Sequence, residues 1–301
     1  MMADTKQMAV KPQLASTVIL IREHNGELQV YLLKRSTRSD FFPETYVFPG
    51  GRVEGEDRVF RLGKAHVDLD SEEIYQRLGG SLTVEEALTC GVTAIRETFE
   101  EAGVLLAYRN EHTHEELERI KDRRQGEELP NGWLNNIVVS DGWMLAFSRL
   151  FRWAHWITPE GMPKRYETRF FLMFMHPGQE CEPDARETTN GVWISPEKGL
   201  MKNLQGEIPL SPPTLVTLHE LLQYSNKRDL KKEVQARTWG EVLLSRMFNL
   251  PEGKLILEPW DPVSKKKLDI ETKGLKMNFL SVGKPFSRLW YNGRIWRPVK
   301  S

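Results

Sequence analysis

Apolar and β-branched residues near the start of the chain predict a β-hairpin. Two such runs cover residues 15–22 and 28–35, and His24-Asn25-Gly26-Glu27 lies between them. An Asn-Gly pair between two apolar runs is a strong signal for a tight turn that joins antiparallel strands. A third short run, residues 46–48, leads directly into Pro49-Gly50-Gly51, where the chain must turn tightly.

A long amphipathic helix is predicted over residues 83–103. Thr83 and Glu86 form the sequence signature of a capping box, and Gly103 is a typical stop residue. A similar pair, Thr113 with Glu116, predicts a charged, solvated helix. The pattern further predicts a short helix over 71–77, strands over 151–157, 169–175, 191–194 and 255–257, a helix over 211–224, and a hairpin around Asn292-Gly293.

The spacing of these elements suggests two parts. We expect a main domain over residues 13–230, followed by a C-terminal extension of short helices and strands over 231–301 that packs on it. The sequence does not decide whether the chain forms a homodimer.

Composition narrows the class of protein. Lys plus Arg and Asp plus Glu both number 42 among 301 residues, so the formal charge is zero. This balance argues against nucleic acid or an anionic membrane as a partner. No apolar stretch approaches the roughly 20 residues of a membrane helix. The only two cysteines, Cys90 and Cys181, fit a reducing compartment, so we expect a cytoplasmic protein.

Three carboxylates gather at the end of the predicted long helix. Glu97, Glu100 and Glu101 lie opposite the apolar stripe, at spacings where like charges repel. The helix dipole also disfavours negative charge at this end. Two interpretations stay open from these residues alone: a solvated acidic surface, or a site where a hard divalent cation such as Mg²⁺ or Mn²⁺ relieves the repulsion.

The context of these acids resembles the Nudix hydrolases. The motif of that family, G-x5-E-x7-R-E-U-x-E-E-x-G-U with U a bulky apolar residue, matches at Gly51 and again over residues 96–104. Asp57 stands where the motif has its first glutamate, and Thr98 stands at an apolar position. Residues 58–95, which number 38, replace the usual seven, so the motif carries an insertion of 38 − 7 = 31 residues.

A comparable insertion is typical of the coenzyme A diphosphatase-like branch of the Nudix proteins. Further segments similar to that branch follow in order, namely residues 32–36, 156–159, 165–171 and 193–196. The resemblance implies an α/β fold, with a mixed sheet between helices and a helical insertion at about residues 58–82. The 31 inserted residues are long enough to overhang the expected site.

The resemblance implies a metal-dependent site. Glu97, Glu100, Glu101 and the Gly51 carbonyl would bind Mg²⁺ or Mn²⁺, and Arg96 would orient a glutamate through an ion pair. The general base would be a glutamate of the motif or Glu187. The residues expected to contact substrate phosphates are Arg35, Arg38, Arg165 and Arg169, with Arg35 and Arg169 favoured.

The implied reaction is hydrolysis of a diphosphate in a nucleoside diphosphate derivative. The leading substrate is coenzyme A or acyl-CoA, which would give 3′,5′-ADP and a 4′-phosphopantetheine. Two alternatives stay open. One keeps the chemistry but acts on ADP-ribose, a nucleotide sugar or a dinucleotide. The other is a nucleotide-binding Nudix module without turnover, although such a module would not need all three glutamates.

Overall fold

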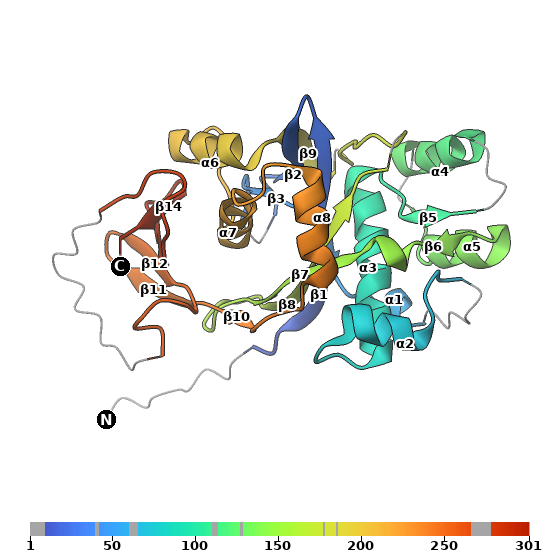
Figure 1. Ribbon diagram of the computed structural model, residues 1–301, viewed down its shortest axis with the longest axis horizontal. Coiled ribbons are helices and arrows are strands. Elements are labelled where there is room, and N and C mark those ends of the chain that lie inside the picture. Colours follow the sequence, from blue (N-terminus) through green and yellow to red (C-terminus); the bar gives the residue numbers. More distant parts are fainter. Residues whose placement is uncertain are drawn as a thin grey trace.

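The computed structural model describes most of the chain in one layered arrangement (Figure 1). The described residues are 10–39, 42–59, 66–109, 114–126, 129–176, 178–184, 186–265 and 278–300. In this part of the chain, no helix is both long enough and apolar enough to cross a membrane.

A mixed eight-stranded sheet forms the centre. Its strands are β1 (Gln13–His24), β2 (Glu27–Arg35), β3 (Tyr46–Val47), β4 (Gly50–Arg52), β7 (Phe151–Ile157), β8 (Tyr166–Phe174), β9 (Thr188–Ile194) and β10 (Leu243–Leu244). Strands β1 and β2 form the predicted hairpin, and Asn25 and Gly26 have φ angles of 51° and 76° at the turn. Two positive φ values are what a type I′ turn requires, so the Asn-Gly prediction is confirmed.

The strand order places β4 inside the hairpin. At the open end of the hairpin, β4 pairs with β1 and β3 pairs with β2. On its other side β1 pairs with β8 in parallel, and β8 pairs with β7. The order across this end of the sheet is therefore β10, β7, β8, β1, β4/β3, β2 and β9.

Helices cover both faces of the sheet. One face carries α1 (Gly55–Val59), α2 (Ser71–Ile74), a π-helical turn (Tyr75–Gly79), α3 (Val84–Ala102), α4 (His114–Gly126) and α5 (Trp133–Asp141). The other carries α6 (Pro196–Gln205), α7 (Pro212–Leu221) and α8 (Lys227–Ala236). Alternate residues of β1 belong to the two cores: Val18 packs with α3, and Ile19 packs with α7. The expected α/β fold is thus confirmed.

Helix α3 begins and ends as its sequence predicts. Thr83 and Glu86 form the reciprocal capping box, and Gly103 ends the helix in the left-handed conformation with φ 70°. Ser16 Oγ donates to the Cys90 carbonyl over 2.7 Å and ties the middle of α3 to β1. The position of the acidic end of α3 is therefore set by the sheet.

The prediction of a solvated helix before residue 124 is wrong for part of α4. Ile120 and Arg124 are both 7% exposed, because α4 lies against the end of α3. The predicted capping box of Thr113 and Glu116 lies outside the residues whose side chains the structure describes. Helices α5, α6 and α8 were not predicted. In α8 only Leu230 and Val234 are buried, too short an apolar stripe to stand out among charges.

The C-terminal segment adds strands on one side of the molecule (Figure 1). Its elements are β11 (Arg246–Leu250), β12 (Gly253–Leu257), β13 (Arg288–Tyr291) and β14 (Trp296–Val299), an antiparallel sheet. Ile256, Leu289 and Trp296 are buried in the same core as α7. Strand β10 pairs with β7 and so joins the main sheet to this segment. The remaining short elements are the strands β5 (Ala107–Tyr108) and β6 (Met144–Leu145) and a 3₁₀ turn (Phe147–Arg149).

Candidate active site

The double glycine of β4 lies directly against the acidic end of α3. The Gly50 N–H donates to Glu101 Oε2 over 2.8 Å. A Cβ atom at Gly51 would overlap the Glu97 carboxylate, and one at Gly50 would overlap the Ser16 carbonyl. Only glycine allows β4 to approach both α3 and β1 this closely. The insertion therefore does not separate the two halves of the motif in space.

Arg96 stands at the centre of a buried charge network. Its guanidinium donates to both oxygens of Asp57, over 2.8 Å from Nε and 2.9 Å from Nη2. Arg96 and Asp57 are 4% and 2% exposed. The same guanidinium pairs through Nη1 with Glu97 over 3.0 Å and with Glu100 over 2.8 Å. A forked donor held on one side by Asp57 presents its remaining N–H groups to the two glutamates in a fixed direction.

Asp57 thus holds Arg96 in place across the insertion. Its carboxylate also accepts from the Thr93 hydroxyl and from the Glu54 N–H, each over 2.9 Å. An aspartate serves at this position of the motif because α1 brings it directly beside α3.

The three glutamates carry more negative charge than their surroundings neutralise. Burial is the main cause that raises the pKa of Glu101 to about 8, although the Gly50 N–H opposes it. Burial likewise raises the pKa of Glu97, against the effect of Arg96, and the neighbouring Glu101 and Glu100 add to the rise. The pKa of Glu100 is also raised, first by burial. Buried carboxylates of this kind stay charged only with further positive charge beside them.

A divalent cation fits this donor set by its chemistry. Carboxylate and backbone carbonyl oxygens are the ligands that hard cations prefer. In the described part of the chain, no three acidic, His or Cys side chains are already grouped as metal ligands. Instead, Arg96 pairs with both Glu97 and Glu100. The Gly50 N–H donates to Glu101, and Trp133 Nε1 donates to Glu100. Binding an ion therefore requires the glutamates to exchange some of these partners.

Two contacts to Glu100 could not be read from the local sequence. Trp133 Nε1 donates to its Oε1 over 2.6 Å, from α5. Arg124 Nε donates to the Glu100 carbonyl over 3.0 Å, from α4. Both side chains come from elements whose packing the sequence pattern did not predict. They hold the last turn of α3 from α5 and α4.

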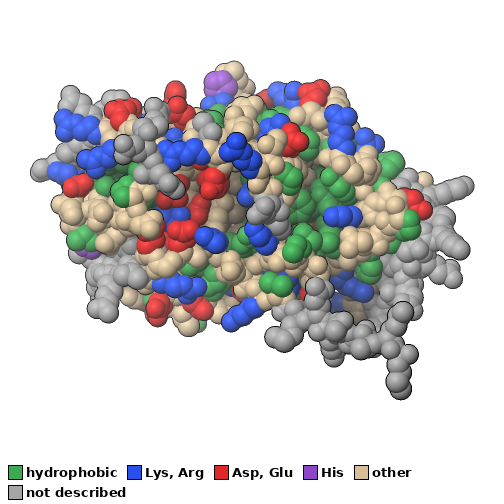
Figure 2. Space-filling view, turned by 180° about the vertical axis from the view of Figure 1, so that it is seen from behind, with side chains coloured by type: hydrophobic (Ala, Val, Ile, Leu, Met, Phe, Trp, Pro, Cys, Tyr) green, Lys and Arg blue, Asp and Glu red, His purple; other side chains and the backbone are tan. Residues whose placement is uncertain are grey.

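A cleft of 1270 Å³ opens beside these groups. Its lining includes eight of the residues that the sequence suggested, namely Arg35, Arg38, Gly51, Arg96, Glu97, Glu100, Glu101 and Glu187. In the face seen in Figure 2, acidic and basic side chains gather beside a hollow, and hydrophobic side chains lie on its other side, towards the C-terminal segment.

Glu187 is exposed in the loop before β9 and lines the cleft. Asp184, which the sequence did not single out, organises this loop. Its carboxylate accepts from the Glu187 N–H over 3.1 Å and from the Thr188 N–H over 2.9 Å. An Asp a few residues before a strand is a turn signal that could have drawn attention to it.

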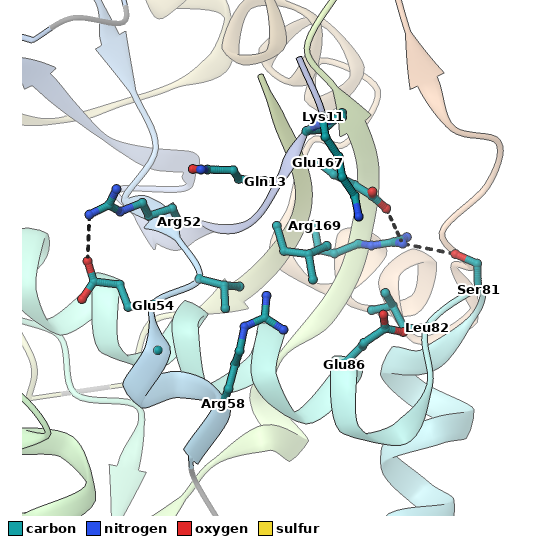
Figure 3. Close-up of a pocket in the computed structure, with 14 residues that line it drawn as sticks. Lys11, Gln13, Arg52, Glu54, Arg58, Ser81, Leu82, Glu86, Glu167 and Arg169 are labelled. Atoms are coloured by element: carbon teal, nitrogen blue, oxygen red, sulfur yellow. Dashed lines mark hydrogen bonds and ion pairs between the residues drawn. The ribbon is translucent and has the colours of Figure 1, made fainter. Parts of the chain in front are cut away.

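Arg165 and Arg169 do not line this cleft. Arg165 donates to the backbone carbonyls of Thr158 and Val10 over 3.1 and 3.0 Å. Arg169 faces a separate pocket of 810 Å³, where its Nη2 contacts Ser81 and Glu167 (Figure 3). Thr168 and Phe170 line the cleft, so strand alternation turns Arg169 to the opposite face of β8. The structure therefore does not bring these two arginines to the glutamates.

The comparisons with known proteins agree with this geometry. A family model described as the NUDT19 Nudix domain matches residues 8–221. The chain belongs to this family. It is a Nudix hydrolase, an enzyme class that generally uses a divalent metal, so the predicted family is confirmed.

Two relatives and one solved structure illustrate the similarity. The acyl-coenzyme A diphosphatase NUDT19 of Xenopus laevis is 26% identical over 313 residues, covering 89% of this chain and 82% of that protein. The human protein of the same name is 25% identical over 316 residues, covering 87% and 80%. A Nudix hydrolase structure from Alicyclobacillus acidocaldarius has a TM-score of 0.57 at 22% identity, covering 75% of this chain and 97% of its own. That structure shows the shared fold.

Proposed function

We propose that this Nudix hydrolase cleaves the diphosphate of coenzyme A and acyl-CoA, giving 3′,5′-ADP and 4′-phosphopantetheine or its acyl ester. The observation that carries the proposal is the order of groups in the cleft. The glutamates lie beside β4, Arg35 and Arg38 lie on the β2 side, and Trp156 and Ile157 lie on the β7 side. The names of the curated relatives support the same substrate class.

Mg²⁺ or Mn²⁺ would be held by Glu97, Glu100 and Glu101, with the Gly51 carbonyl as a further oxygen donor. The ion would neutralise the diphosphate and lower the pKa of a water for attack on phosphorus. Arg96 keeps Glu97 and Glu100 directed towards β4 through its ion pairs. Arg35 and Arg38 would contact phosphate oxygens, because guanidinium groups donate in a fork that suits them.

We assign the general base to Glu187. It is exposed in the cleft, and no hydrogen bond to Arg96 occupies it, unlike Glu97 and Glu100. Water attacks one phosphorus, the bridging P–O bond breaks, and Glu187 takes the proton that the water loses. We expect Glu187→Gln to lower kcat by at least about 10²-fold. A fall of less than threefold in steady-state assays would instead assign the base to a glutamate of α3.

Product analysis tests the substrate. The purified chain is incubated with CoA, an acyl-CoA, ADP-ribose, a nucleotide sugar and a dinucleotide, each with Mg²⁺, Mn²⁺ or EDTA, and products are separated by chromatography. We expect 3′,5′-ADP from CoA and acyl-CoA with either metal, and none with EDTA. Faster hydrolysis of ADP-ribose or another member of the set would overturn the substrate assignment while leaving the diphosphatase chemistry in place.

A cytoplasmic location remains a prediction, and a homodimer is one of the open oligomeric states. Cys90 and Cys181 are both free thiols, which suits a reducing compartment. Size-exclusion chromatography with light scattering would determine the oligomeric state.

A further inference from the structure

The end of the cleft away from Arg35 is built by the C-terminal segment. Ser245, Met247 and Ile256 line it, together with Trp156 of β7. Met247 and Ile256 are opposite each other in the β11–β12 ladder, and β10 pairs with β7 beside Trp156. Residues beyond the Nudix match, which ends at residue 221, therefore form part of the cleft wall.

The strand order places this end at a defined separation from the glutamates. From β4, which contacts Glu97 and Glu101, the order runs through β1 and β8 to β7. Three inter-strand spacings correspond to about 14 Å. Arg35 lies at the end of β2, on the other side of β4. A substrate whose diphosphate lies at the glutamates would therefore extend its two halves in opposite directions, one towards Arg35 and one towards Trp156.

Two buried polar residues, Trp156 and Ser245, line this end of the cleft. The Trp156 side chain is only 6% exposed, and its Nε1–H has no hydrogen-bond partner among the described residues. Ser245 Oγ donates its hydrogen to Glu258 Oε2 over 2.6 Å, so its lone pairs remain available as acceptors. A buried indole N–H without an acceptor is costly, and Trp156 lines the cleft.

The wall at this end combines the polar Thr168 and Tyr166 with apolar side chains. Met247 and Ile256 contribute apolar surface from the C-terminal sheet, and Phe170 contributes it from β8. A ligand with amide groups on an otherwise apolar chain matches these surroundings. A ribose or a sugar, with a hydroxyl on nearly every carbon, would leave its hydroxyls unpaired against Met247 and Ile256.

We propose that this end of the cleft binds the pantetheine arm of the substrate. Trp156 Nε1–H donates to an amide carbonyl, Ser245 Oγ accepts from an amide N–H, and Met247 and Ile256 contact the sulfur end. The C-terminal segment thereby selects substrates that carry an amide-containing arm on the diphosphate. The inference rests on the proposed function, because it assigns one half of that substrate to one end of the cleft.

Product inhibition tests the assignment, because the two products separate the two halves of the substrate. 4′-Phosphopantetheine carries the arm without the nucleoside, and 3′,5′-ADP carries the nucleoside without the arm. In the variant Met247→Trp, a larger side chain fills the arm end. We expect the inhibition constant of 4′-phosphopantetheine to rise about tenfold and that of 3′,5′-ADP to change less than twofold.

Asn249→Trp is the matched control. Asn249 lies two residues further on the same face of β11, is exposed, and does not line the cleft. The Asn249→Trp variant should leave both inhibition constants unchanged. Equal weakening of both products in Met247→Trp, or weakening of 3′,5′-ADP alone, would overturn the proposal. If the wild-type chain hydrolyses no CoA with any metal, the proposed function fails instead, and direct binding of the two products by calorimetry still decides the inference.

A second variant distinguishes recognition from packing. Trp156→Phe removes the indole N–H, which has no partner among the described residues, and keeps an aromatic ring. We expect KM for CoA and the inhibition constant of 4′-phosphopantetheine to rise about tenfold, the value of one hydrogen bond, with kcat changed less than threefold. A lower melting temperature with an unchanged inhibition constant would show a packing role only and would overturn the assignment of this group.

Discussion

Buried and half-buried carboxylates occur in two regions of this molecule, and their partners differ. At the end of α3, Asp57, Glu97 and Glu100 all pair with the single guanidinium of Arg96. In the C-terminal segment, Asp261 has partners of its own. Its carboxylate accepts from Arg288 Nε and from the Ser287 hydroxyl, each over 2.7 Å. Near it, Glu258 accepts only the Ser245 hydroxyl, and its Oε1 is buried without a partner among the described residues.

The pKa values follow the partners. Burial raises the pKa of Asp261, but its hydrogen bonds with Arg288 and Ser287 outweigh that effect, so the pKa is lowered overall. Burial raises the pKa of Glu258 to about 7, because only Ser245 opposes it. The glutamates of α3 have raised values despite Arg96. Asp261 has hydrogen-bond donors for its carboxylate, so its charge is stabilised within the protein. The α3 cluster instead has more carboxylates than positive partners, which suits a bound cation.

The largest expected effect is on the α3 cluster. Glu100→Gln removes one charged oxygen donor while it keeps the size of the side chain, so we expect turnover to fall by at least about 10²-fold. Circular dichroism and thermal melting should show an intact fold. Steady-state rates equal to wild type would remove Glu100 from the metal site. Its role would then be structural, like that of Asp261.

Asp57→Asn should affect stability as well as rate. The substitution leaves Arg96 buried with less compensating charge, although Glu97 and Glu100 remain its partners. We expect a loss on the order of 2 kcal/mol in the free energy of unfolding, measured by urea denaturation. Glu54→Gln, at a partly exposed residue paired with Arg52, serves as the control and should change little. An unchanged urea midpoint in Asp57→Asn would show that Asp57 does not hold Arg96.

Glu258 should make stability depend on pH in the direction opposite to a paired carboxylate. Its pKa in the folded chain, about 7, exceeds its ordinary value of 4.5. Its contribution is therefore fully present below pH 4.5 and is lost as the pH rises towards 7. Relative to wild type, Glu258→Gln should gain on the order of 3 kcal/mol across this window. A pH-independent difference between the two urea midpoints would contradict the raised pKa.

Asp261→Asn should give the smallest change. It removes the charge that pairs with Arg288, whose side chain is 23% exposed, so water can solvate the freed guanidinium. We expect a loss of about 1 kcal/mol, with CoA hydrolysis changed less than twofold. Because the pKa of Asp261 is lowered, its contribution is present above the ordinary pKa of 3.8 and falls as the pH drops below it. A large loss of activity would link this segment to catalysis directly.

Residues close together in the sequence were sufficient to predict the elements near the site. Asn25-Gly26 determines the β1–β2 turn, because few residue pairs accept two positive φ angles. Thr83, Glu86 and Gly103 determine where α3 begins and ends, because they satisfy its terminal N–H and C=O groups. The spacing of the acids then placed them on one side of α3. All of these depend on residues within a few positions of one another.

Only the tertiary structure decided which distant residues share the site. Arg169 was expected near the glutamates, yet the alternation of β8 turns it to the other pocket. Trp133 and Arg124 reach Glu100 from helices that pattern alone did not place. Met247 reaches the cleft from a sheet beyond the family match. Such contacts depend on strand register and on helix packing, which are settled by the burial of the whole core and leave no short-range signal in the chain.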